Sequence, residues 1–366
     1  MRFKEEFRNH DMARALAEKI AGESSGQPMT FMEVCGTHTM ALHRYGIPGL
    51  LPSSIRLLSG PGCPVCVTPN EAVDRAVAYS RKEGCILATF GDMARVPGSE
   101  SSLMHAKAEG ASVAFLYSPR DAIQLAQSRK DRIVVFLAIG FETTAPTVAS
   151  MIEEARELGI GNLLVITAMK TIPMALKALV STEELGLDGF LLPGHLSVIT
   201  GTSLYEFLPE EHGIACVVSG FEPLDILQSL LMLVRQVRHR SPLVENQYIR
   251  VVKKEGNRKA MALIAKVFRE GPSRWRGIGD IPASGLSLAG EYRDFDALEK
   301  LPVSIDEPRE KEGCLCGMIL RGLRTPRECP LFARACTPEE PVGACMVSSE
   351  GTCAAWYKYR RGEETP

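Results

Sequence analysis

The chain has 366 residues, 45% of them hydrophobic and 23% charged, with a formal net charge of −2. A chain of this length can form two or three domains with cores of their own, and its charge excludes a general attraction to nucleic acid. The longest apolar run, which begins at Ile133, is far shorter than the roughly 20 residues of a membrane span, and acidic residues near the N-terminus do not fit a signal peptide.

We therefore expect a cytoplasmic protein that binds neither nucleic acid nor a membrane. Cytoplasmic thiols are mostly kept reduced. The chain contains eleven cysteines, and several of them are clustered. Clustered cysteines in such a protein are expected to be metal ligands or redox groups and not structural disulfides.

The first predicted element is a helix over residues 11–21, where apolar residues recur at helical spacing. The segment FMEVCGTHT then places Cys35 after a short apolar run and His38 three residues later. Cysteine and histidine at this spacing can bind one metal, or His38 can lower the pKa of Cys35. The alternative is a buried cysteine beside a histidine with satisfied hydrogen bonds. The glycine and threonines around the pair favour the functional interpretation.

The next motif is SGPGCPVCVTP, residues 59–69, where prolines and glycines surround Cys63 and Cys66. The run Thr68–Glu71 has the form of a capping box, so a helix should begin just after Cys66 and favour its thiolate. Cys-x-x-Cys can be a redox pair, half of a zinc site, or a chance pattern. The sequence contains no second Cys-x-x-Cys to complete a zinc site.

Between residues 55 and 240, short β-rich runs alternate with helical stretches, which predicts parallel sheets covered on both faces. The strands end in turns rich in glycine, proline and polar groups. Ligands bind at the carboxyl ends of the strands in such sheets, so these turns should gather on one rim. Weaker candidates for lining that cleft, each of which could instead cap a helix or be satisfied within its loop, are Thr143, Thr144, His195, Glu222 and Asp225.

The character of the sequence changes after residue 240. A strand and a helix are followed by a glycine-rich, poorly periodic stretch, and from Gly313 the chain is dense in cysteine. Six cysteines within about 40 residues indicate a metal cluster, either [4Fe–4S] or zinc. They are Cys314, Cys316, Cys329, Cys336, Cys345 and Cys353.

Seven motifs in order resemble the HypD family of [NiFe]-hydrogenase maturation proteins. They are EVCGTHT, SGPGCPVCVTP, TFGDMARVPGS, AIGFETTAPT, LPGHLSVITG, SGFEPLDIL and GACMVSSEGTCAAWY, and together they extend over essentially the whole chain. The family's cluster pattern, Cys-x14-Cys-x6-Cys-x16-Cys, falls on Cys314, Cys329, Cys336 and Cys353. The resemblance therefore implies four [4Fe–4S] ligands and leaves Cys316 and Cys345 as non-ligands.

The resemblance also implies a function. With a small partner, HypC, the family holds one iron while it gains two cyanides and one carbon monoxide. The cyanide arrives from HypE as a thiocyanate on a C-terminal cysteine, and the Fe(CN)2CO unit passes on to the hydrogenase large subunit. The implied roles are Cys35 as the iron ligand, His38 beside it, and Cys63 and Cys66 as a redox-active pair. Such a protein is an assembly scaffold with redox activity and not a conventional multiple-turnover enzyme.

The fold implied is α/β: two Rossmann-like parallel-sheet domains around a cleft, plus a smaller cysteine-rich α+β domain that carries the iron–sulfur cluster and whose cluster surroundings are similar to those of ferredoxin:thioredoxin reductase. We expect domain I at 31–120 with about 215–240, domain II at 121–214, and domain III at 1–30 with 241–366.

We hypothesise that electrons pass from the cluster to a Cys63–Cys66 disulfide and that the resulting thiols assist the iron site, because cyanide transfer from a thiocyanate needs reducing equivalents. One alternative is a free-standing iron–sulfur thiol-disulfide reductase, which would not need Cys35. Another is a nucleotide-dependent enzyme, but no G-x-G-x-x-G follows a strand and no G-x-x-x-x-G-K-[ST] occurs.

Overall fold

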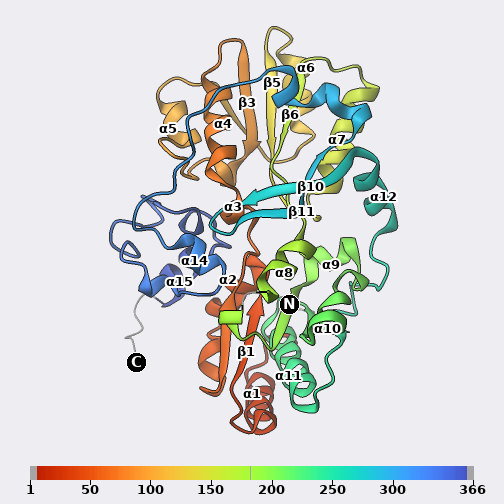
Figure 1. Ribbon diagram of the computed structural model, residues 1–366, viewed down its shortest axis with the longest axis vertical. Coiled ribbons are helices and arrows are strands. Elements are labelled where there is room, and N and C mark those ends of the chain that lie inside the picture. The colour runs from red at the N-terminus through yellow and green to blue at the C-terminus, as the bar shows by residue number, and fades with distance from the viewer. Residues whose placement is uncertain (1–5, 182, 361–366) are drawn as a thin grey trace.

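The computed structural model describes residues 6–181 and 183–360. Two parallel sheets form an upper and a lower lobe, a β-hairpin lies between them, and the cysteine-rich region packs at one side (Figure 1). Residues 1–5 and 361–366, which belong to the predicted third domain, lie outside the described residues. Among the described residues, no helix combines the length and apolarity of a membrane span.

The lower sheet has the strand order β2-β1-β7-β8-β9, and all its strands run parallel. Helices cover both faces, and α1 packs along α11. The strands are β1 (Met29–Glu33), β2 (Ile55–Ser59), β7 (Gly189–Pro193), β8 (Ala215–Ser219) and β9 (Val244–Asn246). The helices are α1 (His10–Ser24), α2 (Gly36–Arg44), α9 (Gly194–Thr200), α10 (Phe207–His212) and α11 (Pro223–His239).

The upper sheet has the order β4-β3-β5-β6 and is also parallel. Its central strand β5 is an unbroken apolar run, as expected of a strand buried on both faces. The strands are β3 (Cys85–Phe90), β4 (Val113–Leu116), β5 (Ile133–Ala138) and β6 (Leu163–Thr167). The helices are α4 (Asn70–Arg81), α5 (Leu103–Ala108), α6 (Asp121–Ser128) and α7 (Ala145–Glu157).

The segments between the lobes include a hairpin that the sequence analysis did not predict. Strands β10 (Phe268–Trp275) and β11 (Gly279–Leu288) pair antiparallel within the glycine-rich stretch, with a register shift between Gly271 and Ser273. The shift breaks the alternation by which a strand is recognised in sequence. The helices near the hairpin are α3 (Pro64–Val67), α8 (Ile172–Val180) and α12 (Arg258–Val267), whereas α13 (Ala297–Lys300) packs on β6 of the upper sheet.

The cysteine-rich region consists of loops and short helices, seen at the left of Figure 1. Its α-helices are α14 (Cys316–Leu320) and α15 (Thr352–Arg360), and α15 packs on α2 of the lower lobe. The 3-10 helices of the chain are η1 (Ile47–Leu50), η2 (Gly91–Met93), η3 (Glu183–Leu185), η4 (Ser203–Tyr205), η5 (Gly290–Phe295), η6 (Pro326–Glu328) and η7 (Ala344–Met346).

The predicted fold class is confirmed: the chain is α/β with two parallel-sheet cores and a cysteine-rich region. Strand pairing nevertheless groups the chain differently from the ranges expected for domains I and II. Strands β3 and β4, expected in domain I, pair with β5 and β6, whereas β7 of the expected domain II lies between β1 and β8. Sequence alternation indicates strands but not which strands pair, because the pairing depends on long-range packing.

Candidate metal and thiol site

Four motifs follow the carboxyl ends of four neighbouring strands of the lower sheet, whereas two other turns that were expected on the same rim, residues 91–99 and 140–146, follow β3 and β5 of the upper sheet. Cys35 follows β1, the Cys63–Cys66 loop follows β2, His195 follows β7, and Phe221 follows β8. The carboxyl ends of parallel strands meet at one edge of the sheet, which is where open α/β sheets place their ligands. The rim of the lower sheet is therefore the candidate site.

Cys35 is the N-cap of α2. The backbone N–H groups of Thr37 and His38 point at its sulfur and favour the thiolate, as expected at a helix N-terminus. Burial has the larger effect and raises the pKa of the Cys35 thiol to about 12. In the chain alone this sulfur therefore holds its proton, and a bound metal ion would have to replace that proton.

The loop that carries Cys63 lies directly against Cys35. The Gly36 N–H donates to the Gly62 carbonyl at 3.1 Å. A Cβ atom at Gly62 would lie 2.2 Å from the Cys35 nitrogen, so only glycine allows this approach. Because Cys63 is the next residue, the two sulfur motifs are brought together as the sequence analysis expected.

Two glutamates that the sequence analysis did not single out support the Cys35 loop. The buried Glu33 carboxylate accepts hydrogen bonds from the Cys35 N–H at 3.0 Å and from the Thr39 hydroxyl at 2.5 Å, and burial raises the pKa of Glu33 to about 7. Glu350 accepts a hydrogen bond from the Thr37 hydroxyl at 2.7 Å. Glu33 lies in a strand-like run and Glu350 is far away in sequence, so only the fold reveals their roles.

His38 is completely buried, and its imidazole acts differently from the prediction that it lowers the Cys35 pKa. Its Nε2 lies 2.9 Å from the Gly220 carbonyl, and the ring stacks on Phe221 at 4.6 Å between centroids. Burial lowers the pKa of His38 to about 4, so the imidazole is neutral and brings no positive charge to Cys35. The backbone N–H of His38, and not its side chain, favours the thiolate.

The weaker cleft candidates divide into two groups. His195 is exposed and stacks at 3.8 Å on Phe221, the same ring on which His38 stacks. Thr143 is exposed and Thr144 caps α7. Glu222 and Asp225 instead hold the start of α11 together.

Glu222 and Asp225 form a capping box at the start of α11, and each of them has an arginine partner. Glu222 forms a bidentate pair with Arg8 at 2.5 and 2.9 Å. Asp225 forms one with Arg250 at 2.5 and 2.8 Å, and its carboxylate also accepts the Glu222 N–H. These contacts connect the N-terminal segment and the Arg250 loop to the start of α11. Because α11 begins directly after Phe221 and Glu222, the two acids also restrict the turn that carries Phe221.

All six C-terminal cysteines line one small cavity, which we call the thiol pocket. The remaining lining is mainly apolar, and a Cβ atom at Gly343 would lie 2.8 Å from the Cys314 sulfur. The Cys316 and Cys345 sulfurs lie 2.8 Å apart. The complete lining is Cys314, Cys316, Ile319, Cys329, Phe332, Cys336, Gly343, Cys345, Met346 and Cys353.

The donor set of the thiol pocket fits an iron–sulfur cluster. Thiolate is the ligand of such clusters, and no carboxylate or imidazole lines the cavity. In the part of the chain that the structure describes, no three His, Cys, Asp or Glu side chains are arranged around a single metal ion. The four cysteines expected as cluster ligands are therefore gathered in one place, and their ligation stays a prediction.

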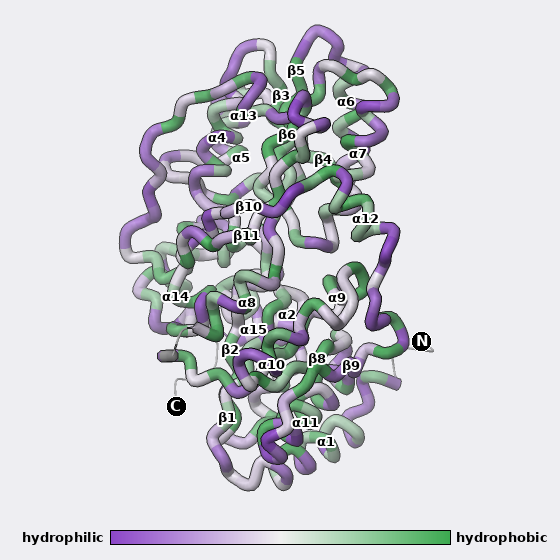
Figure 2. The backbone as a smooth tube through the Cα atoms, turned by 45° about the vertical axis from the view of Figure 1, so that its right-hand side comes forward, coloured by the Kyte–Doolittle hydropathy of each residue, from purple (hydrophilic) through white to green (hydrophobic). Residues whose placement is uncertain are grey.

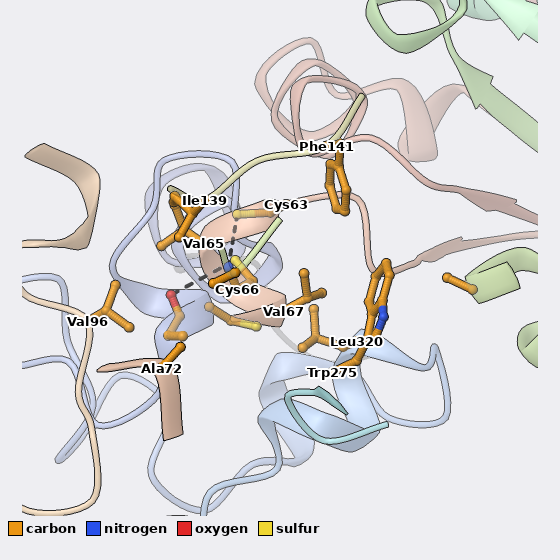
Figure 3. Close-up of a cluster of buried hydrophobic side chains, with 14 of the residues drawn as sticks. Cys63, Val65, Cys66, Val67, Ala72, Val96, Ile139, Phe141, Trp275 and Leu320 are labelled. Carbon is orange, nitrogen blue, oxygen red and sulfur yellow. Dashed lines mark hydrogen bonds between the residues drawn. The ribbon is translucent and has the colours of Figure 1, made fainter. Parts of the chain in front are cut away.

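Cys66 connects the rim to the thiol pocket. Its thiol is in hydrogen-bonding contact with the Cys345 thiol, and its sulfur lies 4.0 Å from the Ala344 carbonyl. The Cys66 N–H points at the Cys63 sulfur at 3.4 Å (Figure 3). A continuous row of thiols therefore runs from the Cys63–Cys66 loop to the cavity.

The surroundings of Cys66 differ from the predicted low-pKa thiolate. Burial among apolar side chains such as Val65, Val67 and Trp275 raises the pKa of Cys66 well above its usual value (Figure 3). The predicted capping box is also wrong, because Pro69 is the N-cap of α4 and the Thr68 hydroxyl donates to a carbonyl in the preceding turn. The predicted helix itself begins at Asn70 as expected.

Glu142, in the turn after β5, is a further buried acid. Its Oε1 accepts the Ile172 N–H at 3.0 Å at the start of α8, whereas its Oε2 has no partner among the described residues. Burial raises the pKa of Glu142 to about 7. The folded chain therefore favours the protonated carboxyl.

The comparisons with known proteins show which family the chain resembles over its whole length. The family model described as "HypD: Hydrogenase formation hypA family" matches residues 11–360. The chain is 47% identical over 369 residues to a hydrogenase maturation factor HypD of Azotobacter vinelandii, covering 99% of this chain and 97% of the relative. It is 43% identical to relatives of the same name from Cupriavidus necator, with 100% and 99% covered, and from Escherichia coli, with 99% of both chains covered.

Substituting Gly62 by alanine tests the contact between the two motifs. The added Cβ cannot fit beside the Cys35 nitrogen, so the loops must separate, and we expect Cys35 to react faster with iodoacetamide, as measured by mass spectrometry of its peptide. The matched control is Gly49→Ala, where a Cβ meets nothing within 4 Å. Equal alkylation rates in Gly62→Ala and the unmodified chain would contradict the contact.

Substituting Glu142 by glutamine tests the buried acid. The Glu142 carboxyl has a pKa of about 7 in the folded chain and about 4.5 when exposed, so ionising it favours unfolding. The free energy of unfolding is therefore unaffected below pH 4.5 and decreases as the pH rises from 4.5 toward 7. We expect Glu142→Gln to be more stable than the unmodified chain at pH 8, by up to about 3 kcal/mol, and equally stable near pH 4.5. Urea midpoints at both pH values measure this, with the exposed Glu157→Gln as control. A pH-independent difference would argue against a buried, protonated carboxyl.

Proposed function

The chain belongs to the HypD family of hydrogenase maturation factors, and from this premise we propose that it is the scaffold on which one iron atom receives its cyanide and carbon monoxide ligands. The observation that carries the proposal is the contact of the Gly62 backbone with Cys35, which places a single buried thiol beside a pair of thiols. Cys35 would supply one soft ligand to iron, and Cys63 and Cys66 beside it can together donate two electrons. This combination suits the attachment of cyanide to iron.

Cys35 is the proposed iron ligand of the chain. Thiolate is a soft ligand that suits iron carrying π-acceptor ligands such as cyanide and carbon monoxide. The N–H groups of Thr37 and His38 would stabilise the thiolate once iron replaces the thiol proton, and the neutral His38 ring brings no positive charge that would compete with the metal. One protein ligand leaves coordination positions open, and we propose that the partner HypC supplies a further ligand.

Cys63 and Cys66 are the proposed reductant of the cyanide donor. HypE would present cyanide as a thiocyanate on its C-terminal cysteine. Two thiols and one thiocyanate give one disulfide, one free cysteine thiol and one hydrogen cyanide, so atoms and electrons balance. The iron then binds cyanide and the proton is released, and the completed Fe(CN)2CO unit would pass to the hydrogenase large subunit.

The proposed resident cofactor is a [4Fe–4S] cluster held by Cys314, Cys329, Cys336 and Cys353. When bound, such a cluster supplies the electrons that return a Cys63–Cys66 disulfide to two thiols. Both cysteines outside the ligand set line the pocket, and one of them, Cys345, also contacts Cys66 of the redox pair.

The burial of the redox pair argues against a free-standing thiol-disulfide reductase. Cys63 is 3% exposed and Cys66 is fully buried. A folded protein with a surface disulfide cannot bring that disulfide to a buried thiol without local opening. A narrow peptide tail that carries a small thiocyanate group is the better match.

The proposed function is tested by infrared spectroscopy of the anaerobically purified chain with HypC. We expect bands from iron-bound cyanide and carbon monoxide, and we expect Cys35→Ala to lose both the bands and the single iron because the ligand is removed. Cys216→Ala, a buried cysteine of β8 outside the site, is the control and should keep them. Bands that persist in Cys35→Ala, or turnover of a disulfide substrate without Cys35, would contradict the scaffold.

The choice of cluster ligands is tested by iron and sulfide content. Cys329→Ala should lose most of the iron, the sulfide and the visible absorption of the cluster, whereas Cys316→Ala should retain them because Cys316 is outside the proposed ligand set. If Cys329→Ala keeps the cluster, or Cys316→Ala loses it while remaining folded by circular dichroism, the assignment of ligands is wrong.

A further inference from the structure

A groove opens between the lower sheet and the cysteine-rich region, on the side of the molecule where β2, α14 and α15 lie together in Figure 2. Its volume is about 490 Å³. We call it the edge groove. Much of its wall is apolar, formed by Leu42, Leu51, Ile55, Leu57, Leu58, Ile319, Leu323 and Trp356.

The edge groove runs along the outer edge of the lower sheet. β2 is the first strand in the order β2-β1-β7-β8-β9, so only β1 pairs with it, and all residues from Ile55 to Ser59 line the groove. The N–H of Met29 bonds to the Ser54 carbonyl and the N–H of Gly60 bonds to the Glu33 carbonyl. In a parallel ladder, the backbone N–H and C=O groups of the even-numbered residues of β2 therefore point toward β1.

It follows that the N–H and C=O groups of Leu57 and Ser59 face away from β1, into the groove. No hydrogen bond joins these backbone groups to a neighbouring strand among the described residues. An unpaired strand edge is a template for another strand. Native sheets usually protect such an edge, and here apolar walls flank it instead.

The charge around the edge groove is positive. Among the described residues that line the groove, Arg56 is exposed and donates to the Leu185 carbonyl at 3.2 Å, and the half-buried Arg360 stacks on Trp356. Arg324 is exposed and pairs at 2.9 Å with Glu328, the one acid among these lining residues. Three arginines and one glutamate favour a ligand that carries negative charge. The apolar walls favour one whose other side chains are hydrophobic.

We propose that the edge groove binds an extended segment of a partner protein in which acidic and apolar residues alternate, and that this segment adds to β2 as a sixth strand of the lower sheet. Its backbone pairs with Leu57 and Ser59, its apolar side chains pack against Leu323 and Trp356, and its acidic side chains meet the arginines. Strand addition obtains affinity from main-chain hydrogen bonds and specificity from alternate side chains, which are the two features this groove offers.

The position of the groove gives this binding a consequence for the site. Ser59 ends β2 and is followed directly by Gly60, Pro61 and Gly62, the turn that contacts Cys35. A strand added beside Ser59 would hold the end of β2 and so reduce the mobility of that turn.

The experiment uses the full-length chain and a dye-labelled peptide, Val-Glu-Val-Glu-Val-Glu, in a fluorescence polarisation titration. We expect saturable binding with a dissociation constant of about 10–100 μM, typical of weak association. Arg56→Glu should weaken it by about tenfold because a cation becomes an anion at the groove. Arg14→Glu makes the same charge change on exposed α1, outside the groove lining, and should leave binding unchanged.

Two further probes separate strand addition from simple charge attraction. The same peptide with every backbone nitrogen methylated should not bind, because it cannot donate to the β2 carbonyls. Leu323→Ala, which removes part of the apolar wall and no stacking partner of an arginine, should weaken binding without affecting the charge. Equal binding of the methylated peptide, equal effects of Arg56→Glu and Arg14→Glu, or no binding at all would overturn the proposal. A dimer in analytical ultracentrifugation that Arg56→Glu dissociates would also overturn it and assign the edge to a second copy.

Discussion

The close approach of the Gly62 backbone to Cys35 is the constraint on which the site depends. Two loops that leave neighbouring strands can touch at this distance only because one of them has no side chain at the contact. The hydrogen bond from Gly36 to the Gly62 carbonyl then fixes the register between the loops. Since Cys63 and the start of α3 follow directly, the position of the redox pair is set by the same contact that positions the single thiol. The chemistry of two motifs is thus joined by backbone geometry and not by side-chain attraction.

Burial determines the charge state of almost every reactive group at this contact. It raises the pKa of Cys35, Cys66 and Glu33 and lowers that of His38, so each group favours its neutral form in the chain alone. A site of neutral groups has no strong field to hold a hydrated ion. It can still hold a soft metal that exchanges for the thiol proton, because the metal brings the charge that burial otherwise excludes. The preference of the site for a soft metal therefore follows from its burial as much as from the thiolate of Cys35.

The features that the sequence predicted are those encoded locally. The apolar run of β5, the helix after Cys66 and the meeting of the turns after β1, β2, β7 and β8 at one edge follow from periodicity and from the geometry of parallel strands. The division of the remaining turns onto a second sheet does not follow from them. The pairing of β3 with β5 instead of β1 could not be predicted, because both partners have the same alternation. The hairpin β10–β11 was missed because its glycines and its register shift remove that signal. The supporting roles of Glu33 and Glu350 were missed because the sequence does not show which carboxylates accept hydrogen bonds in the fold. Glu33 is close to Cys35 in sequence and Glu350 is far from it, and neither position by itself indicates a contact.

The arrangement of the remaining thiols follows from the same burial. In the proposed function, a redox pair that is sheltered from water would keep a bound cyanide from being lost by protonation and diffusion, but the pair would also be inaccessible to soluble protein reductants. Under the same proposal, its electrons arrive through the interior along sulfur atoms that the described residues bring together: Cys66 contacts Cys345, whose sulfur lies 2.8 Å from that of Cys316 at the wall of the thiol pocket. Cys345, which binds nothing in the proposed ligand set, therefore makes the contact between the redox pair and the pocket, and replacing it by an apolar residue would remove that contact. The density of cysteine at the end of the chain is in this sense a consequence of how deeply the rim motifs are buried.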